Sequence, residues 1–206
     1  MQGHHQNLFE KLKEEYRNSG IVPVPHTLRQ EAVLGNSQGT YNFDFDNNRT
    51  PKVTEVKLSK SDVFVSFGWA LLLTQEDPAK LGSGPLRPFV DGAVFPAAAG
   101  FTPGHLEVLY NGNLKAQVDT SIVFDSISTD RFRKVASEFF MDLRRFEPLM
   151  PSLKLNGLKK NNISLNIPTF AGMQLAGVGG VDNKVILELE GFILRGAADI
   201  DYKRPS

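Results

Sequence analysis

The chain contains no cysteine among its 206 residues. Disulfide bonds, thiolate nucleophiles, cysteine-based zinc sites and iron–sulfur clusters are therefore excluded. A chain without cysteine suits a reducing compartment. We expect the protein to be made and used in a cytoplasm, or to be assembled in a host cytoplasm into a particle that leaves by lysis.

An excess of charge of one sign is also missing, because 23 Lys and Arg residues balance 23 Asp and Glu residues. This balance removes the simplest electrostatic attraction to nucleic acid or to an acidic membrane. A helix expected over residues 129–146 has basic ends, but acidic residues are interleaved with them, so a solvated face is preferred over a nucleic-acid contact. A local basic patch is the alternative that the composition leaves open.

Long hydrophobic runs are lacking as well. No segment approaches the length of a membrane span, and residues 1–17 are polar with a helical pattern. We therefore expect neither a signal peptide nor membrane insertion. The hydrophobic share of 41% and the charged share of 22% are ordinary for a globular protein, and the length suits a single domain.

The clearest structural pattern lies in residues 106–125. Apolar residues there follow a period of two on both sides of the dipeptide Asn111-Gly112. Asn and Gly tolerate the positive φ of a tight turn, so this dipeptide between alternating segments is a strong hairpin signal. We predict paired antiparallel strands over residues 106–124 with the turn at Asn111-Gly112.

Other apolar segments are separated by Gly, Asn and Pro, which predict turns and loops. The segment 63–73, VFVSFGWALLL, is continuous rather than alternating, which predicts a strand buried on both faces with Trp69, Phe64 and Phe67 in or close to the core. The remaining strands are predicted at 28–34, 40–45, 52–58, 153–155, 163–167 and 185–194. Together these segments indicate a mainly β fold, an antiparallel β-sandwich or jelly roll with a short N-terminal helix and one further helix.

The N-terminal helix is expected over residues 6–17, followed by a stiff extended linker that contains Pro23 and Pro25. A helix this short needs a surface to dock on. One interpretation is that it covers an end of its own core; the other, which we prefer, is an arm over residues 1–20 that projects from a single β-sandwich domain over 21–206. The arm interpretation makes its apolar stripe a candidate subunit contact. That stripe consists of Leu8, Phe9, Leu12 and Tyr16.

Residues with metal-binding or catalytic chemistry do not form a recognisable motif. One acidic series has spacings like those of an EF-hand loop, but Arg49 stands where that loop needs glycine, so a polar turn is preferred. The four histidines lack the spacing of a cupin-like metal site. We expect no metal, no cofactor and no enzymatic activity. The acidic series is Asp44, Asp46, Asn48 and Glu55, and the histidines are His4, His5, His26 and His105.

Two carboxylates in the last predicted strand, Glu188 and Glu190, could form the acid pair of a glycosidase. Two residues on one face of a strand more often solvate an exposed surface. We therefore expect both side chains to face water.

The short N-terminal helix, the succession of strands, the Pro- and Gly-rich loops and the segments LKLNGLKKNNISLNIP and KVILELEGFILRG resemble structural virion proteins of bacteriophages, of the β-sandwich or jelly-roll kind. The resemblance covers most of the chain and is sharpest at residues 106–125 and 153–195. It implies a capsid or coat subunit that contacts copies of itself and other virion proteins, without catalysis.

Two other classes of protein compete with the coat interpretation. A carbohydrate-binding sandwich would stack exposed aromatic rings on sugar, but the apolar surroundings of Trp69 in the sequence indicate a buried ring. A cupin-like enzyme has the weakest case because the histidine cluster is lacking.

Overall fold

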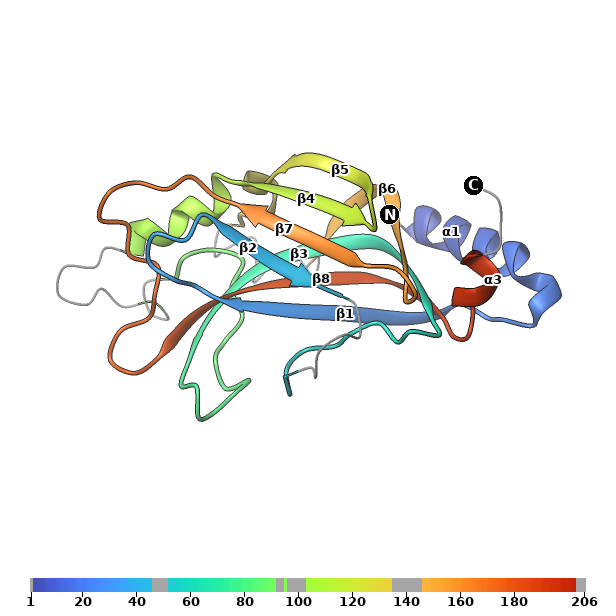
Figure 1. Ribbon diagram of the computed structural model, residues 1–206, viewed down its shortest axis with the longest axis horizontal. Helices are drawn as coiled ribbons and strands as arrows, with labels where there is room; N and C mark the ends of the chain where they lie inside the picture. Colours follow the sequence, from blue (N-terminus) through green and yellow to red (C-terminus); the bar gives the residue numbers. More distant parts are fainter. Residues whose placement is uncertain (1, 46–51, 92–94, 96–102, 135–145, 203–206) are drawn as a thin grey trace.

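The computed structural model describes residues 2–45, 52–91, 95, 103–134 and 146–202. Two four-stranded antiparallel sheets face each other, which confirms the predicted mainly β sandwich (Figure 1). The strands are β1 (Val24–Val33), β2 (Thr40–Asp44), β3 (Val63–Glu76), β4 (Asn113–Val118), β5 (Ser121–Ser128), β6 (Glu147–Asn156), β7 (Asn161–Asn166) and β8 (Asp182–Leu194). The helices are α1 (Gln2–Glu15) and α3 (Ala198–Tyr202), with 3-10 helices η1 (Arg17–Ser19), η2 (Pro103–Tyr110) and η3 (Thr129–Phe132).

The strand order is that of a jelly roll. One sheet has the order β1-β8-β3-β6 and the other has the order β2-β7-β4-β5. The first four strands therefore pair with the last four in reverse order, as β1 with β8, β2 with β7, β3 with β6 and β4 with β5. This is the pairing of one long hairpin folded over on itself, which packs the two sheets face to face, although no residue of β5 is fully buried.

The long strands β3 and β8 are buried on both faces, as the continuous apolar segment predicts. Their ladder runs from the pair Val63–Leu194 to the pair Glu76–Asp182. On the inner face Trp69 is completely enclosed, with its ring 5.1 Å from Phe132 and 6.1 Å from Phe124. The predicted burial of Trp69, Phe64 and Phe67 is confirmed.

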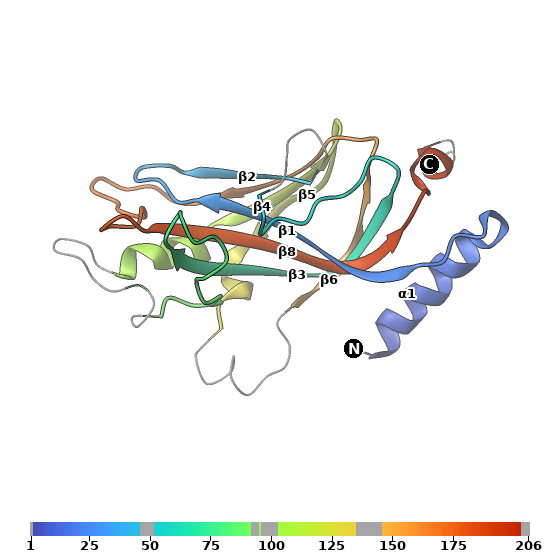
Figure 2. The same ribbon diagram turned by 90° about the horizontal axis from the view of Figure 1, so that it is seen from below.

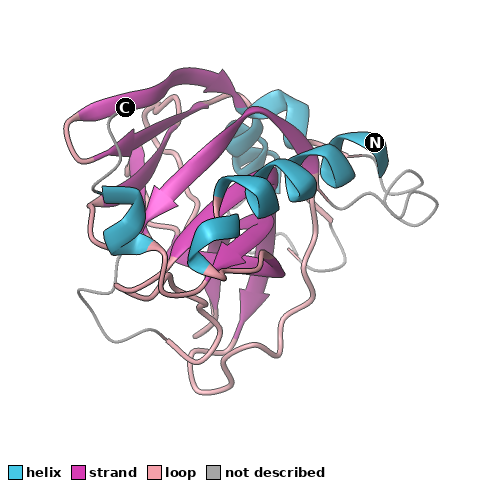
Figure 3. Cartoon of the chain, turned by 90° about the vertical axis from the view of Figure 1, so that its right-hand side faces the viewer, coloured by secondary structure: helices cyan, strands magenta, loops and turns pink. Residues whose placement is uncertain are grey.

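Different segments of the chain cover the two ends of the outer face of the β1-β8-β3-β6 sheet. At one end α1 and α3 pack on Val63, Val65 and Phe192, and Figures 2 and 3 show α1 lying against the end of the long strands. At the other end Leu86 and Phe146 pack on a smaller apolar group in β3 and β8. In the structure α1 therefore covers its own core, which is the alternative interpretation of the N-terminal helix, and does not project as an arm.

The prediction of a hairpin turn at Asn111-Gly112 is also wrong. Residues 103–110 form the 3-10 helix η2, and the hairpin lies between β4 and β5 with its turn at Asp119 and Thr120. The positive φ of 52° that the turn needs is at Asp119. In η2 the adjacent residues Leu109 and Tyr110 are both buried, which a strand with alternating faces does not allow.

Three smaller predictions differ from the structure. Residues 52–58 form no strand and contribute one bridge, between Val56 and Arg29. Val24 and Pro25 belong to β1 rather than to a linker, which is possible because β1 is an edge strand and the missing donor of Pro25 need not face a partner. Of the predicted helix over 129–146, the first residues form η3, residues 135–145 lie outside the described part, and β6 begins at Glu147.

Gly112 is required by close packing rather than by a turn. A Cβ atom at this position would lie 2.3 Å from the backbone oxygen of Asn166. The backbone N–H of Gly112 donates to Oγ1 of Thr129, and its carbonyl accepts from the Thr129 N–H, so the segment cannot easily move away.

We expect Gly112→Ala to lower the free energy of unfolding by about 3 kcal/mol, because the strain of an overpacked backbone contact is not relieved. Gly172→Ala is the matched control, since Gly172 has open space around it but a φ of +77°; it should cost about 1 kcal/mol. Urea denaturation of both variants measures the difference. Equal losses would show that Gly112 is not tightly packed.

Candidate functional site

The apolar stripe predicted as a subunit contact packs on its own chain. Leu12 and Tyr16 are buried, and the ring of Phe9 lies 5.5 Å from the ring of Phe192 on β8. Leu8 and Phe9 are half-buried against the same apolar group. Leu12 and Tyr16 are therefore not available to a neighbouring subunit while α1 is docked.

A polar clamp fixes this docked helix. The hydroxyl of Tyr16 donates to Oδ1 of Asp201 on α3 at 3.1 Å, and Nδ2 of Asn156 donates to Oδ2 of the same carboxylate at 3.1 Å. Lys154 on β6 forms ion pairs with Asp201 and, at 3.3 Å, with Glu15. The carboxylate of Asp201 thus joins the residue that follows α1 to β6 and α3.

The clamp changes the acidity of Asp201. Burial by itself raises the pKa of this carboxyl group, but the hydrogen bonds from Lys154, Asn156 and Tyr16 and the charge of Lys154 outweigh burial and hold the pKa below its ordinary value. Burial of Lys154 likewise lowers the pKa of its amine, but the hydrogen bond to Asp201 and the neighbouring acidic groups dominate and raise it.

A buried charge cluster lies at the opposite end of the same outer face. Lys184 forms ion pairs with Glu76 and, at 3.3 Å, with Glu31, and the side chains of all three residues are at most 2% exposed. Thr54 donates a hydrogen bond to Glu31, and the backbone N–H of Gly82 donates to Glu76. These contacts bind the loops before and after β3 to the sheet, so the cluster has a structural role.

Glu188 and Glu190 do not both face water. Glu188 is buried and forms an ion pair with Arg29 at 3.7 Å. Glu190 is half-buried in a groove of about 380 Å³ lined by Pro25, His26, Thr27, Phe67, Glu190 and Gly191. The expectation of solvation is wrong for Glu188, because loops cover an outer face that the alternating pattern alone assigns to solvent.

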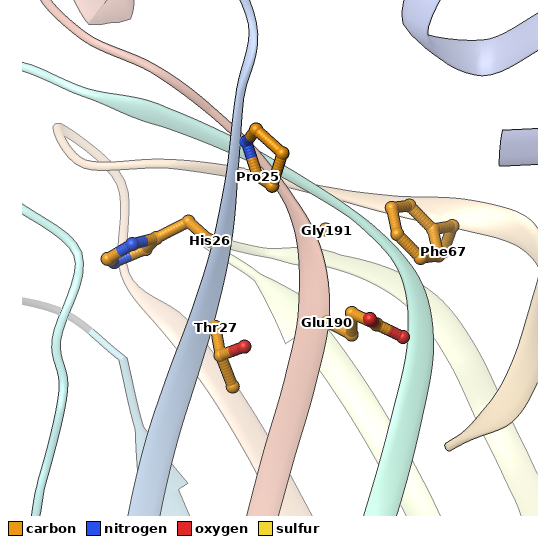
Figure 4. Close-up of a pocket in the computed structure, with 6 residues that line it drawn as sticks. All are labelled: Pro25, His26, Thr27, Phe67, Glu190 and Gly191. Atoms are coloured by element: carbon orange, nitrogen blue, oxygen red, sulfur yellow. The ribbon is translucent and has the colours of Figure 1, made fainter. Parts of the chain in front are cut away.

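The groove has one acidic group in its wall. Thr27 and Glu190 are partners in the β1–β8 ladder, so their side chains lie on the same face of the sheet. In Figure 4 the Glu190 carboxylate extends toward the side of Phe67, whereas the ring of His26 lies on the other side of β1. Burial raises the pKa of Glu190. Glu190 and His26 therefore do not converge as an acid–base pair.

The remaining candidate residues are dispersed. Asp44 accepts a hydrogen bond from Asn162, whereas Glu55 accepts from the backbone N–H of Lys52 and closes a local turn. Asp46 and Asn48 lie outside the described residues, as do the side chains of His4 and His5. His105 accepts a hydrogen bond from the backbone of Gln174, and within the described part no group of three His, Asp or Glu residues is arranged for a metal ion.

The edge strand β5 is an exposed feature that the sequence analysis does not single out. Among the described residues it pairs only with β4, and Ile122 and Val123 are 52% and 40% exposed. The three consecutive apolar residues Ile122, Val123 and Phe124 could have predicted this exposure, because at least one of three successive strand residues must face outward.

Comparison with known proteins gives no relative, since no family model, curated protein or solved structure matches the chain. The class of the protein is thus defined by its fold, a jelly-roll β-sandwich. None of the helices in the described ranges has the length and apolar character needed to cross a membrane.

The clamp predicts an acid-sensitive contribution to stability. Because the pKa of Asp201 is lower in the folded protein than its ordinary value of 3.8, the contribution is complete above that value and is lost as the pH falls through the folded-state pKa. We expect Asp201→Asn to lower the free energy of unfolding at neutral pH by roughly 1.5–3 kcal/mol, since hydrogen bonds to a charged group are lost. Its stability should also decline less than that of the wild type as the pH falls below about 4.

Urea denaturation at a series of pH values measures this difference. Asp77→Asn is the control, because Asp77 forms an ion pair with Lys80 at 3.8 Å but its side chain is 41% exposed. The control should keep the acid dependence of the wild type. An Asp201→Asn protein with unchanged acid dependence would show that the clamp is not formed in solution.

Proposed function

We propose that the chain is a structural subunit of a homo-oligomeric assembly, a coat protein of the virion type that its sequence resembles. It would act through contacts with copies of itself and with other virion proteins, after assembly in a host cytoplasm, and not through catalysis. The observation that carries the proposal is the open edge of β5 with Ile122 and Val123 exposed on it.

An open edge strand is a template for pairing with another chain. Its outward N–H and C=O groups have no ladder partner among the described residues, and proteins that stay monomeric usually protect such edges with Lys, Pro or a covering segment. The sequence of β5, SIVFDSIS, contains neither Lys nor Pro, and its one charged side chain, Asp125, forms an ion pair with Lys115 of the adjacent strand β4. Exposed apolar side chains beside free backbone groups support a role in protein contacts.

The partner that fits this edge best is a second copy of the same chain. Two identical edges that pair antiparallel are related by a two-fold axis, so each backbone donor on one copy meets the equivalent acceptor on the other. Register shifts between β4 and β5 twist the strand. Such bulges limit open-ended strand addition and favour a contact of defined length.

The alternative of a carbohydrate-binding module has no specific support. Trp69 is fully enclosed between the sheets, and among the described side chains Phe170 is the one exposed aromatic ring. That ring packs edge-on against His105 at 5.2 Å. A single ring that is already in contact with a neighbour makes a poor stacking platform for sugar.

The proposal predicts that a charge on the β5 edge disrupts assembly without disrupting the fold. We expect Ile122→Lys to shift the protein to smaller species in sedimentation velocity, because a charged side chain on an edge strand opposes pairing with another chain. The free energy of unfolding should change by no more than about 0.5 kcal/mol, since the side chain is exposed.

Val178→Lys provides the matched control, because Val178 is 43% exposed but lies in a loop far along the chain from β5. This variant should assemble like the wild type. A wild-type chain that stays monomeric at every concentration would refute the proposal, and equal effects of the two substitutions would refute the role of β5.

A further inference from the structure

We propose that the groove beside Glu190 binds a primary ammonium group carried on a short aliphatic stem. The inference goes beyond the proposed structural role, because it rests on the outer face of the β1-β8-β3-β6 sheet and not on the β5 edge. Figure 4 shows the six residues that line the groove.

Glu190 is a half-buried carboxylate without a compensating cation among the residues that the structure describes. The other carboxylates buried on this face each have a cation: Glu188 has Arg29, and Glu31 and Glu76 share Lys184. For the side chain of Glu190, by contrast, the described chain provides no ion pair and no hydrogen bond, and burial raises its pKa. A carboxylate that is partly removed from water without a partner is destabilised in its charged form, and a bound cation would restore that stability.

The Glu190 carboxylate is accessible from the groove. Gly68 faces Glu190 across the β3–β8 ladder, and a Cβ atom at Gly68 would lie 3.5 Å from Oε2 of Glu190. A larger residue there would fill the space in front of the carboxylate. The same space is bounded by Cβ of Phe146 at 3.2 Å and by the carbonyl oxygen of Glu147 at 3.5 Å, so Glu190 is reached through the groove that it lines, on the side of Thr27 and Phe67.

An aromatic ring and a hydroxyl group complete the wall of the groove. The ring of Phe67 is held against Phe192 with 5.2 Å between centroids, which gives the groove a fixed aromatic side. Thr27 adds a hydroxyl group on the same face as Glu190. A carboxylate, a hydroxyl and an aromatic ring together match an ammonium group, which donates three hydrogen bonds and is attracted to aromatic rings.

Other ligand chemistries fit less well. Calcium takes six or more oxygen ligands, and the groove offers one carboxylate and one hydroxyl side chain. An anion would be repelled by Glu190. The volume of about 380 Å³ accommodates a small amine whose stem packs on Pro25 and Phe67.

The same ammonium chemistry can come from a free alkylamine or from a lysine side chain of a second copy of the chain. The probe for both is ethylammonium chloride, titrated into the full-length protein at neutral pH and followed by backbone amide chemical shifts. Ethanol, a neutral molecule of similar size, tests the need for charge. We expect saturable shifts at Thr27, Glu190 and Gly191 with ethylammonium, and none with ethanol at the same concentrations.

Glu190→Gln should weaken ethylammonium binding at least about tenfold, because the charge-assisted hydrogen bond is lost. Glu107→Gln is the matched control: Glu107 is also half-buried, but it is paired with Arg133 at 3.1 Å, so its substitution should leave binding unchanged. Absence of saturable shifts, equal shifts with ethanol, or an unchanged affinity in Glu190→Gln would each overturn the inference.

Sedimentation with and without ethylammonium separates the two sources. If ethylammonium dissociates an assembly of the wild-type chain, the natural ligand is a lysine side chain of a second copy. If ethylammonium binds and the size of the protein does not change, the natural ligand is a free amine. If the chain is monomeric and still binds ethylammonium, the result contradicts the proposed assembly but supports the proposed ammonium site in the groove.

Discussion

The double-sided burial of β3 and β8 is the constraint on which the rest of the structure depends. The inner faces of these strands pack around Trp69 against the second sheet, and their outer faces carry a further set of apolar residues that would otherwise meet water. Because each Å² of exposed apolar surface costs about 25 cal/mol, the outer face needs a cover. The N-terminal helix, α3 and the loops flanking β3 provide it, and the Asp201 clamp and the Lys184 cluster hold that cover in place.

The sequence predicts the class of fold and most strands, because period-two alternation and continuous apolar runs report burial directly. It does not predict which outer faces are covered. Glu188 and Glu190 alternate with apolar residues as solvent-facing residues do, but Glu188 and Lys184 are buried under loops whose docking is a tertiary event. Asn111-Gly112 has hairpin chemistry, yet Gly112 serves a close backbone contact with Asn166 from a distant part of the chain. The groove was not predictable, since Thr27 and Glu190 become neighbours only through the β1–β8 register.

The fold leaves the edges of the sheets as the surfaces on which the proposed function depends. A jelly roll seals its two inner faces, and in this chain the outer face of the β1-β8-β3-β6 sheet is largely covered as well, so faces are poor places for large partners. Edges remain, and β5 is an edge strand with exposed apolar side chains and no protecting Lys or Pro. The docked helix α1, which the sequence suggested as a contact, is instead part of the cover. The proposed contacts between subunits therefore involve an edge rather than an arm.

Amide hydrogen exchange at several protein concentrations tests the central claim most directly, since it reports on the sealed strands and on the open edge in one measurement. The account predicts that amides of β3 and β8 are strongly protected at every concentration. It also predicts that β5 amides exchange rapidly in dilute solution and become protected as the protein assembles. Rapid exchange in β8, or protection of the outward amides of β5 that does not depend on concentration, would contradict it.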